Sequence, residues 1–280
     1  MKIISVENYK GGVGKTTTSI HLACGLKLLN KNLRVLLIDL DPQSSIKTYF
    51  KIKFDKLTIH EFIFNSPLSD CVYKIPISLS HSLEKFDIDI IPSSAKFSEF
   101  ESRASTIPGK EFLLKRRLEE ERINDLYDVI ILDCPPAFSA QSQNAMVASD
   151  YIIVPTHCDG FSISAIQFLQ KTLEDIKKYL KLEPKILGIL PTNYDGRHLV
   201  SKDVLGGLRT FFKDTYVFNP IRTNTQFKKC QLNKKTIFEY ESGALNGTKD
   251  YTAFCVDVAK RIGLTKVTEK VSSKESEATL

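Results

Sequence analysis

A glycine-rich stretch near the start of the sequence, NYKGGVGKTT at residues 8–17, limits the possible folds of this chain more than any other feature. Its three glycines allow backbone conformations that a Cβ atom would forbid. Successive N–H groups can then turn inward around an anion. A strand-like run, Ile3–Glu7, precedes the stretch, and a helix-like run, Lys15–Leu29, follows it. This order of strand, loop and helix is the context that a phosphate-binding loop requires.

The polar residues of this loop each have an expected partner in a nucleotide bound with Mg²⁺. Lys15 would place its charge on the β- and γ-phosphates, and Thr16 would offer its hydroxyl to Mg²⁺. The helix that begins here adds the positive end of its dipole at the same place. We therefore expect the nucleotide to be held by Gly11, Gly12, Val13, Gly14, Lys15, Thr16 and Thr17, the last of them at the α-phosphate.

Two further apolar runs end in aspartate, RVLLID at residues 34–39 and VIILD at residues 129–133. The carboxyl ends of parallel strands meet at one edge of a sheet, so Asp39 and Asp133 are expected beside the loop. Asp133 would hold Mg²⁺ through a water molecule. A strand-end aspartate is also a common helix cap or turn residue. The glycine-rich loop favours the metal interpretation over that one.

Apolar runs without alternation are separated by amphipathic runs of helix length along most of the chain. Strands are expected at Ile3–Glu7, Arg34–Asp39, Ile88–Ile91, Val129–Asp133, Tyr151–Pro155 and Ile186–Pro191. Helices are expected at Lys15–Leu29, Lys110–Ile123, Ser162–Leu180, Ser201–Phe212 and Tyr251–Ile262. This pattern predicts an α/β fold, a single P-loop domain with a mostly parallel central sheet covered by helices on both faces.

The domain is expected to span residues 1–266, with residues 44–85 as a less regular surface region. Residues 267–280 have little to bury and are expected to form a disordered tail. The chain shows no signal-peptide pattern and no run of about 18 apolar residues. Its six cysteines include no Cys-x-x-Cys pair, which favours buried free thiols. We therefore expect a cytoplasmic protein.

The formal net charge of +6 is concentrated in residues 201–240, which hold eight basic and three acidic residues. A basic face can bind polyanions, and nucleic acid is the first candidate. A lysine-rich solvated surface would have the same composition. Composition alone favours this second interpretation.

Three motifs in order, KGGVGKTT, VLLIDLDPQ and VIILDCPPA, resemble those of the deviant Walker A ATPases, and more narrowly those of ParA/Soj partition proteins. The resemblance extends over about residues 1–265. It implies that Lys10 is a signature lysine, which reaches across a homodimer to the phosphates held by the other copy. It also implies that Asp41 positions the attacking water and that Asp39 lies near Mg²⁺ and its waters. Without the resemblance, Lys10 would be a solvated loop residue.

The resemblance also implies contacts later in the chain. Asn193, Arg222 and Asn224 would contact the base and ribose, although the segment NPIRTNTQF departs from the usual pattern of the family. Arg209 would contact DNA, supported by Lys202, Lys213, Lys228 and Lys229.

The function that the resemblance implies is ATP-dependent DNA partition. ATP and Mg²⁺ would be bound by a homodimer that coats nonspecific double-stranded DNA on the nucleoid. A ParB-type centromere-binding protein would stimulate slow ATP hydrolysis and so release the dimer. The alternative is a MinD-like positioning ATPase that acts on a membrane or another cargo. Membrane action would require a basic amphipathic helix at the C-terminus, which the Ser- and Glu-rich tail does not offer. No membrane partner is therefore expected.

Overall fold

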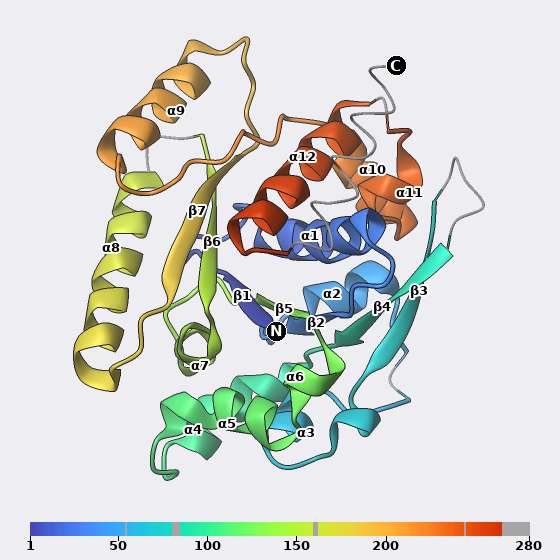
Figure 1. Cartoon of the computed structure of the whole chain (residues 1–280), viewed down its shortest axis with the longest axis vertical. Coiled ribbons are helices and arrows are strands. Elements are labelled where there is room, and N and C mark those ends of the chain that lie inside the picture. Colours follow the sequence, from blue (N-terminus) through green and yellow to red (C-terminus); the bar gives the residue numbers. More distant parts are fainter. Residues whose placement is uncertain (54, 80–84, 159–161, 244, 265–280) are drawn as a thin grey trace.

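The computed structural model describes residues 1–53, 55–79, 85–158, 162–243 and 245–264. Within these residues, seven strands form one sheet in the order β3-β4-β2-β5-β1-β6-β7 (Figure 1). Only the β3–β4 pair is antiparallel there. The strands are β1 (Lys2–Val6), β2 (Val35–Asp39), β3 (Tyr73–Ser78), β4 (Lys85–Ile91), β5 (Val129–Asp133), β6 (Tyr151–His157) and β7 (Lys185–Thr192). The expected fold class is confirmed.

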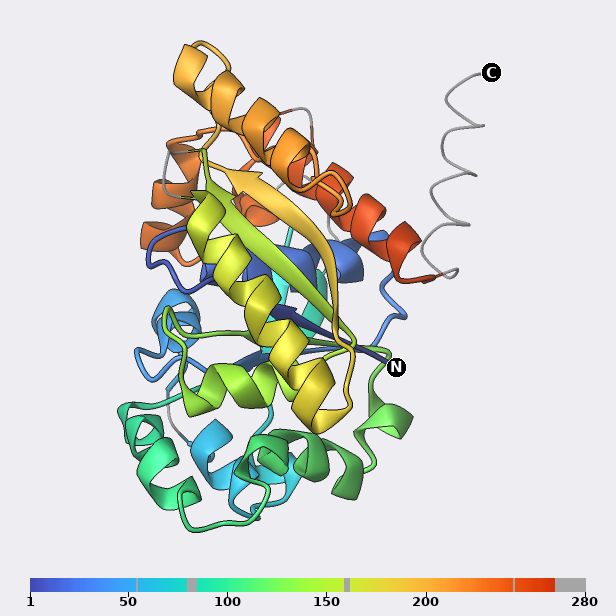
Figure 2. The ribbon, with the colours of Figure 1, turned by 90° about the vertical axis from the view of Figure 1, so that its left-hand side faces the viewer.

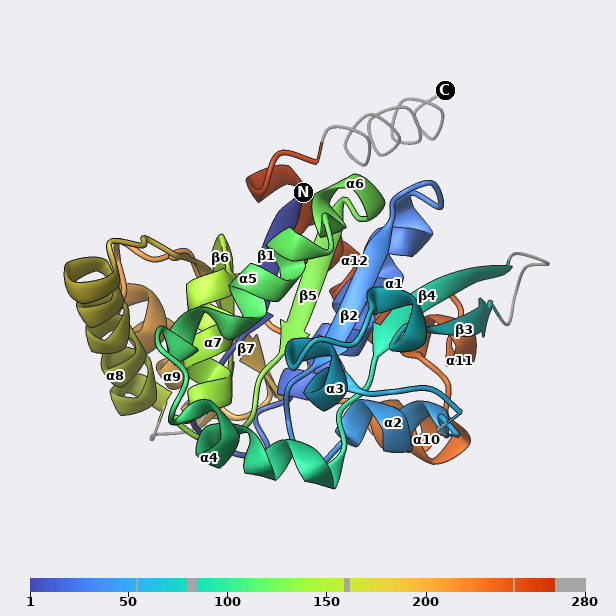
Figure 3. The same ribbon diagram turned by 90° about the horizontal axis from the view of Figure 1, so that it is seen from below.

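Helices cover both faces of the sheet, which explains why its central strands are largely apolar. Every residue of β2 and β5 is buried. On one face α1 (Lys15–Leu29) packs against α12 (Asn246–Arg261), and on the other α5 (Leu113–Glu120) packs against α7 (Ala140–Ala148) (Figure 3). Beside β6 and β7 lie α8 (Ser162–Asp175), which continues as a π-helical turn at Ile176–Leu180, and α9 (Leu199–Phe211) (Figure 2).

Shorter helices fill the connections. They are α2 (Ser45–Phe50), α3 (Ile59–Ile63), α4 (Phe100–Ala104), α6 (Ile123–Leu126), α10 (Gln226–Asn233) and α11 (Ile237–Tyr240), with 3₁₀ turns at Leu68–Asp70, Ala95–Glu99 and Lys110–Phe112.

Two expectations about local structure were wrong. The single helix expected at Lys110–Ile123 is a 3₁₀ turn followed by α5 and, after Arg122 with its positive φ of 47°, by α6. Residues 44–85 are more regular than expected, because they include α2, α3 and the edge strand β3. The expected tail at residues 267–280 lies outside the described residues, so the domain boundary stays a prediction.

Both edges of the sheet are partly closed. At one edge, β3 carries Pro76, which has no N–H to offer, and the Ser78 N–H donates to Glu239 Oε1 at 3.2 Å. At the other edge, a later segment runs along β7. There Ile189 N–H donates to the Tyr216 carbonyl at 2.8 Å, and Phe218 N–H donates back to the Ile189 carbonyl at 2.9 Å. At these positions, each edge is blocked against pairing with another strand.

The six parallel strands β1, β2, β4, β5, β6 and β7 all run in the same direction, so their carboxyl ends meet at one edge. In the register of the sheet, Asp39 lies opposite Asp133, and Asp133 lies opposite Val6. The two strand-end aspartates and the loop after β1 are therefore brought together, as the sequence predicts.

Candidate nucleotide-binding site

The loop between β1 and α1 has the backbone of an anion cradle. Gly12 and Gly14 have positive φ angles of 76° and 93°, which disfavour any residue with a side chain. Gly14 is the N-cap residue of α1, and no side chain caps the helix. The N–H groups of the first turn are thus left to bind an anion, which the helix dipole also favours.

Lys15 lies folded onto this loop. Its side chain is buried, and its Nζ donates to the carbonyl oxygens of Asn8 at 2.7 Å and Lys10 at 2.9 Å. Burial lowers the pKa of the ammonium, while the nearby carboxyl groups of Glu7 and Asp133 oppose that change. An ammonium has three donors, so one remains for another acceptor. A bound phosphate would give the Lys15 ammonium a charged acceptor in place of neutral carbonyl oxygens.

Asp133 ends β5 beneath the loop and is fully buried. Its Oδ1 accepts a hydrogen bond from Ser19 Oγ at 2.9 Å, whereas Oδ2 has no hydrogen-bond partner among the described residues. Burial raises the pKa of Asp133 to about 7, although the nearby Thr16 and Ser19 hydroxyls favour the charged form.

The orphaned oxygen of Asp133 and the neighbouring hydroxyl of Thr16 fit a Mg²⁺ ion that keeps its waters. Across the described ranges, no group of three His, Cys, Asp or Glu residues could hold a metal by itself.

Asp39 and Asp41 lie at the end of β2. Asp39 is fully buried, and its two oxygens accept backbone N–H groups from Asp41 at 3.0 Å and Ile46 at 3.2 Å. Burial raises the pKa of Asp39 well above its usual value. Asp39 therefore fastens the segment between β2 and α2, and its expected place near Mg²⁺ stays a prediction. The carboxylate of Asp41 accepts only the Gln43 N–H, at 2.9 Å on Oδ1, among the described residues.

Glu7 is a residue of this site that the sequence reasoning missed. It follows the last residue of β1, is fully buried, and neither carboxyl oxygen has an N–H or O–H partner among the described residues. Burial raises its pKa to about 8, although the Cys134 thiol and the Lys15 ammonium favour the charged form. The sequence does carry one signal for Glu7: an acidic residue stands between an apolar run and the glycine-rich loop. The sequence pattern alone predicts Glu7 only as the last residue of the strand.

The front of the loop is tied to its surroundings on both sides of Lys10. The Lys10 N–H donates to Asn8 Oδ1 at 2.9 Å, and Asn8 Nδ2 donates to the Pro155 carbonyl in β6 at 2.7 Å. The ring of Tyr9 meets Phe138 edge to face at a centroid distance of 5.7 Å and Phe168 at 5.1 Å. Phe138 and Phe168 also meet each other at 5.8 Å, and we call these three residues the aromatic trio.

The three residues expected to contact the base lie close together, but two of them are already bound to acidic side chains. Asn193, with a positive φ of 52°, accepts a hydrogen bond from the Thr223 hydroxyl at 3.1 Å. Arg222 forms a two-pronged pair with Asp250, with Nη2 2.6 Å from Oδ1 and Nε 3.0 Å from Oδ2. Asn224 Nδ2 donates to Glu241 Oε1 at 2.9 Å. A base contact by Arg222 or Asn224 would therefore require an acidic partner to be released.

The expected DNA-binding residues are all exposed but do not form one group. Lys202 and Arg209 lie on α9, seven residues apart and so on the same side of the helix, and Lys213 follows it. Lys228 and Lys229 lie on α10, which is well separated from α9 (Figure 1).

The fold and the loop together define a P-loop nucleotide-binding protein. A family model described as an AAA domain matches residues 1–186. The sporulation initiation inhibitor protein Soj of Bacillus subtilis (strain 168) is 31% identical over 261 residues, which cover 93% of this chain and 98% of Soj. The chain belongs to this AAA-domain family, in its ParA/Soj branch.

Solved structures agree with this assignment. A putative plasmid partition protein from Borrelia burgdorferi B31, bound to AMPPNP, is 27% identical with a TM-score of 0.72, and 93% of this chain and 98% of that chain are covered. The cobyrinic acid a,c-diamide synthase of Mycobacterium smegmatis, with bound ADP and magnesium, is 26% identical with a TM-score of 0.74, covering 92% and 94%. In the part of the chain that the structure describes, we find no helix with the length and apolarity to cross a bilayer.

Proposed function

We propose that this chain is a DNA-partition ATPase of the ParA/Soj type. ATP with Mg²⁺ closes a homodimer, the dimer binds nonspecific double-stranded DNA on the nucleoid, and a ParB-type partner stimulates hydrolysis and release. The observation that carries the proposal is the uncapped glycine loop with the buried Lys15 and the orphaned Asp133 oxygen, in a chain related to Soj. The cytoplasm is the proposed location.

The proposed chemistry assigns one task to each part of the site. The loop N–H groups and Lys15 hold the phosphates, with Lys15 exchanging its carbonyl partners for phosphate oxygens. Thr16 and Asp133 would hold Mg²⁺, which would supply positive charge at the β- and γ-phosphates. Asp41 orients a water whose oxygen attacks the γ-phosphorus, so that the bond to the β,γ-bridging oxygen breaks and ADP and phosphate leave. Lys10 of the other copy stabilises that charge in trans.

The function as a whole is tested by binding to a duplex of arbitrary sequence with ATP, with ADP and without nucleotide, over a series of salt concentrations. We expect binding only with ATP, falling steeply as salt rises, because phosphate contacts release counterions. A chain that binds ATP but no DNA in any state would contradict partition. Vesicles of anionic lipid would then test the MinD-like alternative.

Lys10→Ala is expected to abolish the ATP-dependent dimer while ATP affinity changes by less than about threefold, because Lys10 serves the other copy's phosphates. Sedimentation velocity with ATP and Mg²⁺ measures the dimer, and titration with a fluorescent ATP analogue measures affinity. Lys53→Ala, at an exposed lysine in the loop after α2, is the matched control. A Lys10 variant that dimerises like the control would remove the role in trans.

Asp41→Ala is expected to slow ATP hydrolysis about 100-fold or more, within the range for lost positioning of a proton-transfer group. ATP binding and the dimer should persist, so the variant should remain on DNA. Phosphate release under single-turnover conditions measures the rate, with the exposed Asp55→Ala as the matched control. Turnover at the normal rate would exclude Asp41 from the mechanism.

Arg209→Glu is expected to weaken DNA binding by about tenfold or more and to lower the salt dependence by roughly one counterion per copy. Dimerisation should be unchanged. Lys260→Glu on α12 changes the charge by the same amount at another exposed position and is the control. Equal effects of both variants would mean that net charge matters and that α9 has no particular contact.

A further inference from the structure

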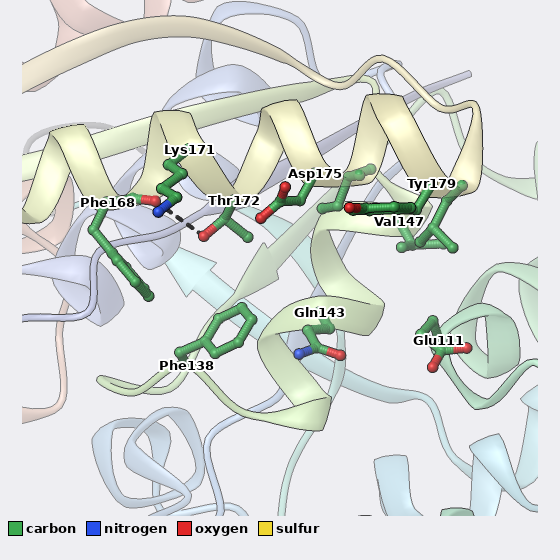
Figure 4. Close-up of a pocket in the computed structure, with 11 residues that line it drawn as sticks. Glu111, Phe138, Gln143, Val147, Phe168, Lys171, Thr172, Asp175 and Tyr179 are labelled. Atoms are coloured by element: carbon green, nitrogen blue, oxygen red, sulfur yellow. Dashed lines mark hydrogen bonds between the residues drawn. The ribbon is translucent and has the colours of Figure 1, made fainter.

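A groove between α7 and α8 lies outside the nucleotide site and has no role in the proposed mechanism. Its cavity volume is about 430 Å³, and the surface that lines it is mostly apolar. Figure 4 shows Phe138 and Phe168 facing each other at one end, and Val147 and Tyr179 together at the other. The groove therefore extends along the whole C-terminal part of α8.

Three large side chains around this groove are unusually exposed. Phe138 is 47% exposed, Phe168 49% and Tyr179 67%. A single exposed apolar residue is ordinary, but several of them around one hollow mark an interaction site. Aromatic side chains are also the residues that contribute most binding energy at protein interfaces.

The shape of the groove suits a short helix. Phe168 and Tyr179 are separated by about three helical turns, or roughly 16 Å at the usual rise per residue. The far end is formed by the π-helical turn Ile176–Leu180, which is wider than an α-helical turn. Such turns are rare and often lie at functional sites. An amphipathic helix of about three turns presents apolar side chains at the matching spacing.

The groove also carries charged side chains that are available to a ligand. Glu111, Lys171 and Asp175 line it, and none of them forms an ion pair with another residue in the described part of the chain. In Figure 4, Lys171 lies near Phe168, while Asp175 and Glu111 lie farther along. Complementary charges would place an acidic residue of the ligand near Lys171 and basic residues near Asp175 and Glu111.

We propose that this groove binds an amphipathic helix of a partner protein, with leucine or phenylalanine side chains between Phe168 and Tyr179 and basic residues facing Asp175 and Glu111. The aromatic trio gives the site a physical connection to the nucleotide loop, because Phe138 and Phe168 both contact Tyr9, the neighbour of Lys10. A bound helix would thus hold the front of the loop. Only this last consequence, for ATP hydrolysis, rests on the proposed function.

The test is selection from a phage-displayed library of peptides about 16 residues long, on the full chain without nucleotide or DNA. We expect peptides with apolar residues at helical spacing and an excess of lysine and arginine. Phe168→Glu and Tyr179→Glu should each weaken their binding about tenfold or more, and Asp175→Lys should weaken it severalfold. Leu199→Glu on α9, where the native leucine is 70% exposed, should leave binding unchanged.

All four positions are exposed or partly exposed, so the variants should fold, and a melting temperature for each checks this. Failure to select any peptide, or peptides that bind the groove variants as well as the control, would overturn the proposal. A change of oligomeric state in Phe168→Glu without loss of peptide binding would also overturn it and identify an interface between copies. Because no ATP or DNA is present, failure of the partition function would leave this result unaffected.

Discussion

Lys15→Ala is expected to lower ATP affinity by roughly 30-fold to several thousandfold, which corresponds to about 2–5 kcal/mol for removing one partner of a buried charge pair. Lys15 is buried at the start of α1, where its two present acceptors are backbone carbonyls of its own loop. An ATP γ-phosphate would gain a charged donor there without drawing a lysine in from solvent. The affinity is measured by titrating a fluorescent ATP analogue in the presence of Mg²⁺.

Lys53→Ala, at the exposed lysine in the loop after α2, is the matched control for this prediction. Its ATP affinity should stay within about threefold of the wild type. The melting temperature of Lys15→Ala without nucleotide must also be measured, because the Asn8 and Lys10 carbonyls lose a donor. A folded Lys15→Ala protein with unchanged ATP affinity would contradict the assignment of the loop.

Glu7→Gln is expected to stabilise the nucleotide-free protein at alkaline pH and to have little effect near pH 5. Burial raises the pKa of Glu7 from 4.5 to about 8, so the folded state keeps a proton that the unfolded state has released. The free energy of unfolding therefore falls as pH rises between these two values. The total loss is of the order of 4 kcal/mol. Glutamine does not ionise, so the variant does not lose this part of its unfolding free energy as the pH rises.

Urea unfolding of both proteins at about pH 5 and about pH 8.5 measures the difference. The comparison cancels titrating groups that do not interact with Glu7, whereas Lys15 and Asp133 do interact with it. Glu101→Gln, at an exposed glutamate on α4, should show no such pH dependence. A stability difference between Glu7→Gln and the wild type that is the same at both pH values would mean that Glu7 is already ionised in the folded protein.

The sequence predicted the parts of the fold where one strong requirement decides the structure. A parallel strand covered on both faces must be largely apolar, so the run VIILD predicted β5 at its observed bounds. The helix after the glycine loop was predicted equally well, because the loop fixes its first turn. The strand β3 was missed, since its sequence YKIPIS alternates and contains a proline, features of an edge strand that resemble those of a loop.

Residues of the candidate site could be predicted where they belong to a sequence motif. They could not be predicted where their role depends on how distant elements pack. The motif identified Lys15 and Asp133, but nothing in it indicates that Glu7 is sealed beneath them. The partners of Arg222 could not be foreseen either, because Asp250 lies 28 residues later on α12. Such pairings depend on how distant elements pack, which a local pattern does not record.

The partly closed edges of the sheet affect how copies of the protein behave at high local concentration. A protein that accumulates along a polymer reaches local concentrations at which open strand edges would join neighbouring copies into insoluble stacks. Here Pro76 interrupts one edge, and the backbone of Tyr216 and Phe218 occupies part of the other. Pairing of densely packed copies through these strand edges should therefore be hindered.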